Sequence, residues 1–206
     1  MDLVEAIKKH SGFPFEIPDT SRDDLPDFFA DLGFKIGAEI GVYKAEFTEK
    51  LAKTGLKIYG IDPWIIYKYF DNPRGQKRMD FLYEHSLRVL KPYPNATLIR
   101  KTSMEAVKDF PDNSLDFVYI DANHEFKYIA EDLYEWTKKI KRGGIVSGHD
   151  YFYLKSGTGK EHWHVAYVLD AYLKAFGIKN FYVLGSKNPK EGERRDKWRS
   201  WMFLKP

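Results

Sequence analysis

The chain has 206 residues, of which 43% are apolar and 17% aromatic, so it can form one domain with a substantial core. It contains no cysteine, which excludes disulfides, cysteine-ligated zinc and thiol nucleophiles and favours a cytoplasmic protein. Its net charge is only +3, from 33 basic and 30 acidic residues, so nucleic acid is not an expected partner.

The N-terminal residues lack the long apolar stretch of a secretory signal, and no apolar run approaches the roughly 20 residues of a membrane span. We therefore expect no membrane partner. A basic cluster at residues 187–199 could attract an anionic ligand, but three acidic residues interrupt it. We interpret it as a solvated loop between two strands.

The first 34 residues are expected to form an N-terminal helical extension, and residues 35–206 are expected to form the main domain. Apolar spacing predicts helices at residues 2–10 and 22–32, separated by Pro14 and Pro18. Seven strands are predicted further along, at residues 35–40, 56–61, 96–100, 117–120, 145–147, 181–184 and 198–204. The helices between them are predicted at residues 44–53, 75–90, 104–110, 126–140 and 161–176.

The alternation of strands and helices predicts an α/β fold with a mostly parallel sheet and right-handed crossovers. The last two predicted strands have no helix between them, so they must run antiparallel.

Ionisable side chains follow two of the predicted parallel strands. Asp121 ends the strand at residues 117–120, with His124 three residues later, and His149 and Asp150 end the strand at residues 145–147. Neighbouring parallel strands end on one edge of a sheet, where α/β folds bind ligands. We therefore expect these four groups to share one crevice.

The first strand after the extension runs into a turn that contains glycine. Gly41 allows a tight turn and the close approach of a ligand. The dinucleotide fingerprint G-x-G-x-x-G is absent, and Glu39 in place of a second glycine suits a positively charged ligand. Asp62 ends the next strand and could accept both hydroxyls of a ribose, or could merely cap a turn. Together, Gly41 and Asp62 favour a nucleoside site.

Four segments carry a resemblance to a known family: EIGVYKAEFTEKLA, YGIDPW, FVYIDANHEFKYIAEDL and KRGGIVSGHDY. The chain resembles a class I S-adenosylmethionine-dependent methyltransferase. It is similar to the branch of the macrocin and mycinamicin sugar O-methyltransferases (methyltransferase family 24), and more distantly to catechol O-methyltransferase. The resemblance runs from about residue 35 to the C-terminus. It implies a Rossmann-like, doubly wound α/β sheet of seven strands, mostly parallel with an antiparallel last strand.

The resemblance also implies a binding site for S-adenosylmethionine. The implied contacts are Glu39, Gly41 and Tyr43 for the methionine end, Asp62 for the ribose, Trp64, Thr102 and Ser103 for the adenine, and Asp121 for the methionine amine and the reacting centre. Ala45 stands where relatives commonly have glycine, which is a mild change in the loop.

In metal-dependent relatives, three ligands to a divalent ion occupy positions that correspond here to Asp121, His149 and Asp150. Carboxylates suit magnesium, whereas the imidazole favours manganese or another transition metal. The alternative is that His149 and Asp150 only cap a loop. His124 takes the position of a catalytic lysine in the catechol-type enzymes, and a histidine can accept a hydroxyl proton at neutral pH. The alternative is that His124 caps the following helix.

These observations lead to the hypothesis of an O-methyltransferase for a small-molecule hydroxyl, on a sugar or a phenol, with Asp121 and His124 as catalytic residues. Two alternatives stay open: a nicotinamide-dependent oxidoreductase on a similar fold, and a cofactor-binding protein without activity. Residues 64–78 and 151–160 are interpreted as lids, and His162 and His164 as substrate contacts. The first 34 residues could cover the acceptor site or form a homodimer contact.

Overall fold

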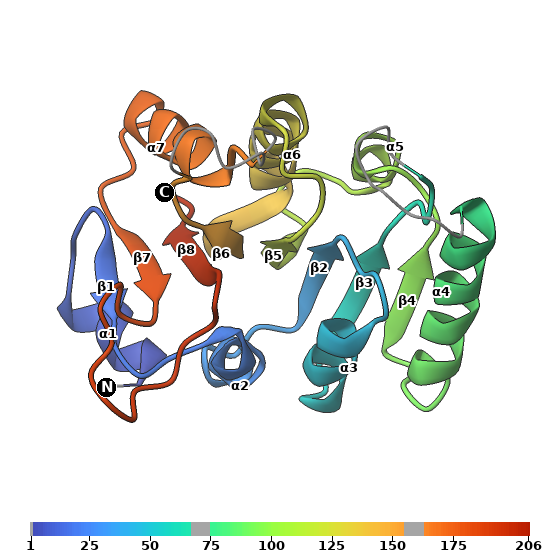
Figure 1. Ribbon diagram of the computed structural model, residues 1–206, viewed down its shortest axis with the longest axis horizontal. Helices are drawn as coiled ribbons and strands as arrows, with labels where there is room; N and C mark the ends of the chain where they lie inside the picture. The colour runs from blue at the N-terminus through green and yellow to red at the C-terminus, as the bar shows by residue number, and fades with distance from the viewer. Residues whose placement is uncertain (1, 67–74, 155–162) are drawn as a thin grey trace.

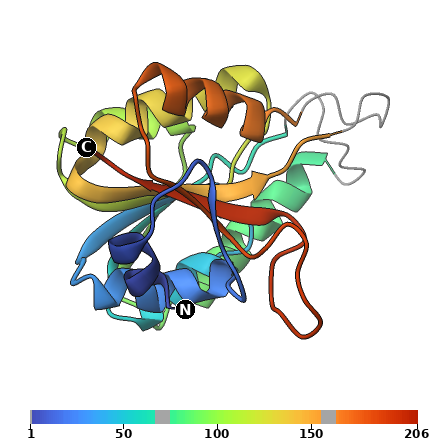
Figure 2. The ribbon, with the colours of Figure 1, turned by 90° about the vertical axis from the view of Figure 1, so that its left-hand side faces the viewer.

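A computed structural model describes residues 2–66, 75–154 and 163–206. The described residues form one eight-stranded sheet between two layers of helices (Figures 1 and 2). The strands are β1 Phe15–Ile17, β2 Ile36–Ile40, β3 Lys57–Ile61, β4 Ala96–Ile99, β5 Leu115–Ile120, β6 Ile140–Tyr151, β7 Phe181–Leu184 and β8 Arg199–Leu204. The helices are α1 Leu3–Lys9, α2 Leu25–Asp31, α3 Glu46–Lys53, α4 Gly75–Leu90, α5 Ser103–Ala106, α6 Phe126–Lys139 and α7 Val165–Ala175, with 3-10 turns η1 Arg22–Asp24 and η2 Val107–Asp109.

The predicted α/β class with a mostly parallel sheet is confirmed. The strand order is β1-β7-β8-β6-β5-β2-β3-β4, and β2 at the centre pairs in parallel with both β3 and β5. Every residue of β5 is buried, as expected for a strand covered on both faces. Because β2, β3, β5 and β6 all run in the same direction, their carboxyl ends meet along one edge of the sheet.

The antiparallel final pair is also confirmed. Strand β8 runs antiparallel to both of its neighbours, β6 and β7. The expected count of seven strands is wrong, because β1 adds an eighth in parallel with β7, with Phe15 opposite Tyr182. The sequence did not predict β1, since a three-residue strand just after Pro14 and just before Pro18 is too short to show an alternating pattern.

The two helical layers cover opposite faces of the sheet. Helices α5, α6 and α7 lie on one face, and α1, α2 and α3 on the other, with α4 packed beside α3 (Figures 1 and 2). In α6, the predicted apolar face is buried at Ile129, Leu133 and Trp136. Phe126, which belonged to the same predicted period, is 60% exposed because it occupies the first position of the helix.

The N-terminal segment packs into the same core as the sheet. Leu25 and Phe29 of α2 are fully buried, and the ring of Phe29 stacks on Phe117 of β5 at 4.0 Å between centroids. The division into an extension of 34 residues and a separate domain stays a prediction. Among the described helices, none has the length and apolar character needed to cross a membrane.

Candidate active site

Asp62, at the end of β3, organises the turn that follows β2. Its Oδ2 accepts hydrogen bonds from the backbone N–H groups of Val42 at 3.1 Å and Tyr43 at 3.0 Å. Its Oδ1 accepts a hydrogen bond from the backbone N–H of Trp64 at 2.7 Å. Burial raises the pKa of Asp62, and these three N–H groups work against that rise. Asp62 therefore fixes the shape of the glycine turn through the backbone.

Gly41 sits where this turn meets the end of β5. Its φ is +90°, and a Cβ on it would lie 2.1 Å from the carbonyl oxygen of Asp121. Only glycine fits such an approach of two backbones without a shift of one of them. The turn after β2 and the end of β5 are thus in direct contact. Residues 39–43 and 62, at the carboxyl ends of β2 and β3, are called the β2–β3 end below.

Glu39 is buried on β2, with only 3% of its surface exposed. Its carboxyl accepts a hydrogen bond from the hydroxyl of Thr48 on α3. Burial raises the pKa of Glu39 to about 8, despite the hydrogen bond from Thr48, and the charge of Asp121 adds to the rise. Glu39 therefore lies next to the edge of the sheet as a group that is largely protonated at neutral pH.

Tyr43 and Trp64 extend the β2–β3 end. The Tyr43 side chain is 42% exposed, whereas Trp64 is only 1% exposed and packs against Tyr83 of α4. The indole N–H of Trp64 donates to the carbonyl of Tyr43 at 3.0 Å. Trp64 is therefore part of the wall behind the turn, and its contact with an adenine stays a prediction.

Thr102 and Ser103 lie at the start of α5, which follows β4 in the chain and packs against α6. Thr102 is the N-cap of α5 and forms a capping box with Glu105. The Ser103 hydroxyl donates to the carboxyl of Asp132 and accepts from the indole N–H of Trp136 at 2.7 Å. Both side chains thus have protein partners in this structure, and their contact with an adenine also stays a prediction.

The second cluster, called the β5–β6 end below, comprises residues 121–124, 149 and 150. The carboxylate of Asp150 lies between two histidines, with Oδ2 at 2.7 Å from Nε2 of His124 and Oδ1 at 3.3 Å from Nδ1 of His149. Burial alone would raise the pKa of Asp150, but the two histidines hold it well below its usual range. The structure therefore brings together the four groups that the sequence placed in one crevice.

Two of these groups have pKa values that follow from their mutual contacts. Burial opposes the protonation of His149, but Asp150 and Asp121 outweigh it, so the pKa of His149 is raised. Burial raises the pKa of Asp121, and the nearby charge of His149 only partly offsets this. The β5–β6 end is thus a coupled group of acids and imidazoles.

The atoms that could hold a metal ion differ from the predicted set. Asp121, His124 and Asp150 each offer one donor atom, and these atoms lie within 4.8 Å of one another. The Nε2 atom of His124 is buried and makes no hydrogen bond within the described part of the chain, although Asp150 is near. His124 therefore takes the place in this group that the sequence gave to His149, and a metal site stays a prediction.

Arg22, in the turn η1, is a site residue that the sequence did not predict. Its Nη1 donates to Oδ2 of Asp121 at 3.2 Å, across 99 positions of sequence. Its guanidinium also lies over the ring of Phe47, 5.3 Å from the centroid. No local pattern signals this contact, because it depends on how the N-terminal segment folds over the sheet.

Aromatic rings line the outer side of His124. Its imidazole stacks on Trp163 at 4.5 Å, and Phe152 lies between Trp163 and Trp198 at 5.3 and 4.2 Å. His164 also contributes here, since its backbone N–H donates to the carbonyl of His124 at 2.8 Å. The interpreted lids fall mostly on residues 67–74 and 155–162, which together with His162 lie outside the described residues.

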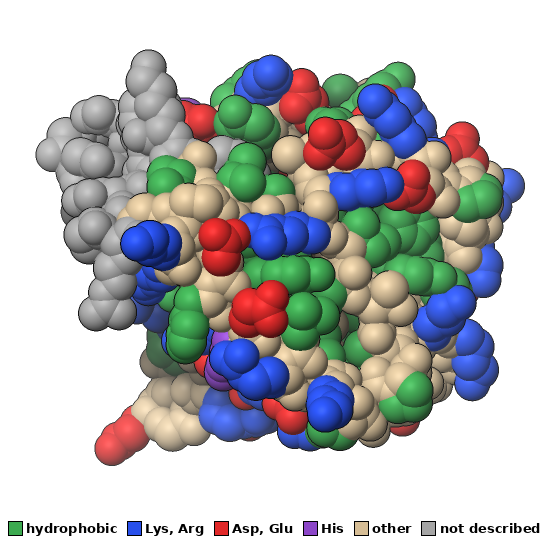
Figure 3. All heavy atoms as spheres, turned by 90° about the vertical axis from the view of Figure 1, so that its right-hand side faces the viewer, with side chains coloured by type: hydrophobic (Ala, Val, Ile, Leu, Met, Phe, Trp, Pro, Cys, Tyr) green, Lys and Arg blue, Asp and Glu red, His purple; other side chains and the backbone are tan. Residues whose placement is uncertain are grey.

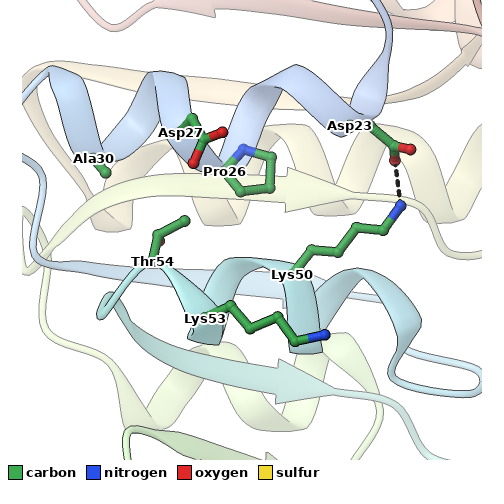
Figure 4. A pocket seen from close by; sticks show the side chains of 7 residues that line it. All are labelled: Asp23, Pro26, Asp27, Ala30, Lys50, Lys53 and Thr54. Carbon is green, nitrogen blue, oxygen red and sulfur yellow. Dashed lines mark hydrogen bonds and ion pairs between the residues drawn. The ribbon is translucent and has the colours of Figure 1, made fainter.

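Two surfaces lie away from the site. A groove of about 480 Å³ runs between α2 and α3, where Lys50 pairs with Asp23 (Figure 4). On the side of the molecule that carries α4 and β4, acidic and basic side chains are mixed around apolar ones, so that no single sign of charge dominates this face (Figure 3).

The loop at residues 185–198 is bound to the N-terminal segment through Arg194. Arg194 pairs with Asp19 and Asp24, and the following strand adds an ion pair between Arg199 and Glu16. The interpretation of this region as a solvated loop between two strands therefore needs a correction: it lies between β7 and β8, but it also anchors the segment that carries Arg22.

Comparison with known proteins places the chain in a family. Residues 34–151, more than half of the chain, match the sequence model of the family described as "Methyltransferase domain". One curated relative, the uncharacterized protein y4gI of Sinorhizobium fredii, is 31% identical over 67 residues. That match covers 32% of this chain but only 7% of the relative, so this chain corresponds to a small part of that protein.

Solved structures of methyltransferases share the fold at low sequence identity. A candidate caffeoyl-CoA O-methyltransferase from Staphylococcus aureus has a TM-score of 0.64 at 14% identity, over 89% of this chain and 82% of that one. The O-methyltransferase from Bacillus cereus in complex with SAH has 0.61 at 11%, over 89% and 80%. The N-methyltransferase NodS from Bradyrhizobium japonicum has 0.57 at 15%, over 90% and 94%. The likeness therefore extends over nearly the whole chain.

Proposed function

This chain belongs to the methyltransferase-domain family, and on that premise we propose that it is an S-adenosylmethionine-dependent O-methyltransferase acting on a hydroxyl of a small molecule, a sugar or a phenol. The observation that carries the proposal is the contact between the two strand-end clusters. Asp62 holds the glycine turn by its backbone, and Gly41 brings that turn against Asp121. A nucleoside-binding turn and an ionisable acceptor site thus share one edge of the sheet.

When bound, S-adenosylmethionine supplies a methyl group on a positively charged sulfur. The carboxylate of Asp121 gives this edge a negative charge that suits such a cation, whereas the buried carboxyl of Glu39 is largely protonated and would act as a hydrogen-bonding group. Asp62, at the end of β3, would accept a hydroxyl group of a ribose on Oδ1, which receives only one of the three hydrogen bonds from the turn. Holding both reactants in line accounts for most of the expected rate enhancement.

His124 is the residue proposed to take the acceptor proton. The hydroxyl oxygen forms a bond to the methyl carbon as the S–CH3 bond breaks, with the electron pair going to sulfur to leave S-adenosylhomocysteine. The O–H bond breaks at the same time, and the proton passes to the imidazole. Asp150, 2.7 Å from Nε2, would stabilise the imidazolium that results. The two carboxylates and Nε2 of His124 also fit a divalent ion, which would be held by Asp121, His124 and Asp150 in place of the contact between His124 and Asp150. Such an ion would act as a Lewis acid toward the acceptor oxygen.

The test begins with binding. Calorimetric titration of S-adenosylmethionine should give a dissociation constant in the micromolar range for the wild type, and at least a tenfold weaker one for Asp62→Asn, whose amide can accept fewer of the backbone and ribose hydrogen bonds. Asp80→Asn is the matched control, since Asp80 is an exposed acid on α4 paired with Arg100. No binding by the wild type would disprove the cofactor assignment.

The second step tests for turnover. Formation of S-adenosylhomocysteine in the presence of a panel of sugars and phenols would exclude an inactive binding protein. Replacement of the base by His124→Gln should lower turnover at least tenfold with little change in cofactor affinity. If turnover and cofactor affinity fall together, His124 has a structural role and the base lies elsewhere.

A further inference from the structure

Arg22 brings a guanidinium from the N-terminal segment to the edge of the sheet. Its side chain is 31% exposed and reaches Asp121, which is 23% exposed, so both can be approached from solvent. The ring of Phe47 covers one face of the guanidinium. Asp121 and Asp196 contribute negative charge around it. A cation is thus held beside the proposed position of the cofactor's amino-acid end.

The segment that carries Arg22 is firmly attached on both sides. The backbone N–H of Arg22 donates to Oδ2 of Asp196 at 2.7 Å. Ser21 and Asp24 form a capping box over the turn η1. Asp23 pairs with Lys50 of α3 at 2.6 Å. The guanidinium is therefore positioned in advance and does not depend on a flexible tail.

The hydrogen bonds of this guanidinium are incomplete. An arginine side chain has five N–H donors, and the pair with a carboxylate is strongest when two of them contact both oxygens. Here a single donor, Nη1, contacts a single oxygen of Asp121 at 3.2 Å, and no other described residue accepts a side-chain hydrogen bond from Arg22. Arginine–carboxylate pairs are frequently bidentate, and the single contact here leaves donors of Arg22 available for a second anion.

We propose that Arg22 forms a carboxylate-binding subsite for the amino-acid end of the cofactor. The free N–H groups of Arg22 would bind the α-carboxylate, while Asp121 would accept the neighbouring α-ammonium group. Each charge of that zwitterion would then face its opposite. The proposal rests on the proposed function, and it gives the N-terminal segment a role in recognition of the cofactor.

The test compares two ligands that differ only in the carboxylate: S-adenosylhomocysteine and its decarboxylated analogue, S-adenosyl-3-thiopropylamine. The wild type should bind the first at least tenfold more tightly. In Arg22→Gln, the affinity for S-adenosylhomocysteine should fall about tenfold or more, while that for the analogue stays within about twofold. Arg22→Lys should recover part of the discrimination because a lysine keeps the charge but not the fork.

Arg194→Gln is the matched control, because Arg194 anchors the same segment through Asp19 and Asp24 but does not contact Asp121. It should leave the discrimination between the two ligands intact. Equal weakening of both ligands in Arg22→Gln, or no weakening of either, would overturn the carboxylate subsite. If the wild type bound neither ligand, the cofactor assignment itself would be wrong, which is a distinguishable result. Melting temperatures identify any variant that fails to fold.

Discussion

The β2–β3 end and the β5–β6 end of the sheet are stabilised by different interactions. At the β2–β3 end, three backbone N–H groups satisfy the carboxylate of Asp62. At the β5–β6 end, charged side chains satisfy one another, with Asp121 against Arg22 and Asp150 against two histidines. The first end depends on backbone geometry, whereas the second depends on protonation. We therefore expect substitutions at the β2–β3 end to act mainly on stability through the backbone, and substitutions at the β5–β6 end to act through charge and protonation.

The largest effect is expected where the backbone alone determines the geometry. Gly41→Ala would place a Cβ 2.1 Å from the carbonyl oxygen of Asp121, at a φ of +90°. The clash and the strained φ together should lower the free energy of unfolding by roughly 3 kcal/mol or more. Gly55→Ala is the control, since Gly55 has a φ of +84° but nothing within 4 Å.

Urea unfolding of both variants separates the clash from the strained φ. Gly55→Ala should cost about 1 kcal/mol, the penalty of the left-handed backbone conformation alone. If both variants lost the same free energy of unfolding, the close contact between Gly41 and β5 would add no penalty beyond the strained φ. The backbone at the β2–β3 end would then be able to shift, contrary to the proposed difference between the two ends.

A second, smaller effect on the free energy of unfolding is expected from Glu39, the ionisable group buried at the β2–β3 end. The pKa of Glu39 is raised to about 8 in the folded protein, from an ordinary value of 4.5. The folded state therefore keeps a proton that the unfolded state releases, and this contribution is full below pH 4.5 and is lost as the pH rises through 8. Glu39→Gln, which resembles the protonated form, should be more stable than the wild type by up to about 3 kcal/mol at pH 7.5.

The measurement is the free energy of unfolding of wild type and Glu39→Gln at pH 5 and pH 7.5. The advantage of the variant should grow with pH. Asp132→Asn offers a parallel case on α6, because burial raises the pKa of Asp132 to about 7 and the sign of the effect is the same. A constant difference between wild type and Glu39→Gln at both pH values would show that Glu39 titrates normally.

The smallest effect concerns metal binding at the β5–β6 end. Manganese at about ten times its dissociation constant should stabilise the wild type by about 1.4 kcal/mol, seen as a rise in melting temperature. Asp150→Asn should abolish that rise, because it removes one of the three donors grouped by the structure. His10→Gln, in the N-terminal segment, controls for binding to other histidines. If manganese and a chelator both left the melting temperature and turnover of the wild type unchanged, the metal proposal would be wrong.

Much of the fold could be predicted from local patterns. The apolar period of α6 and the absence of a helix between β7 and β8 are both properties of short stretches of sequence. Strand β1 could not be predicted because its three residues are stabilised by pairing with β7 and not by their own pattern. The full length of β6, from Ile140 rather than residue 145, was missed because its glycines resemble a helix stop.

The site shows the same division. Asp121, His124, His149 and Asp150 were predicted to meet because strand ends of a parallel sheet share an edge. Which histidine faces the two carboxylates could not be predicted, because that depends on side-chain direction at the strand end. Arg22 lay outside any motif, since its contact with Asp121 forms only when distant segments pack together.

The pairing of β1 with β7 has a consequence for the order of folding. Phe15 is paired with Tyr182, so β1, the first strand in the chain, can pair only after β7 has been synthesised. During synthesis, the central parallel strands can assemble first, while β1 has no partner strand until β7 leaves the ribosome. Contacts of such long sequence separation form late and slow the folding of a domain. A truncated or stalled chain that ends before β7 would therefore contain the glycine turn, Asp62 and Arg22, but not the pairing with β7 or the contact with Asp196 that help to hold the Arg22 segment in place.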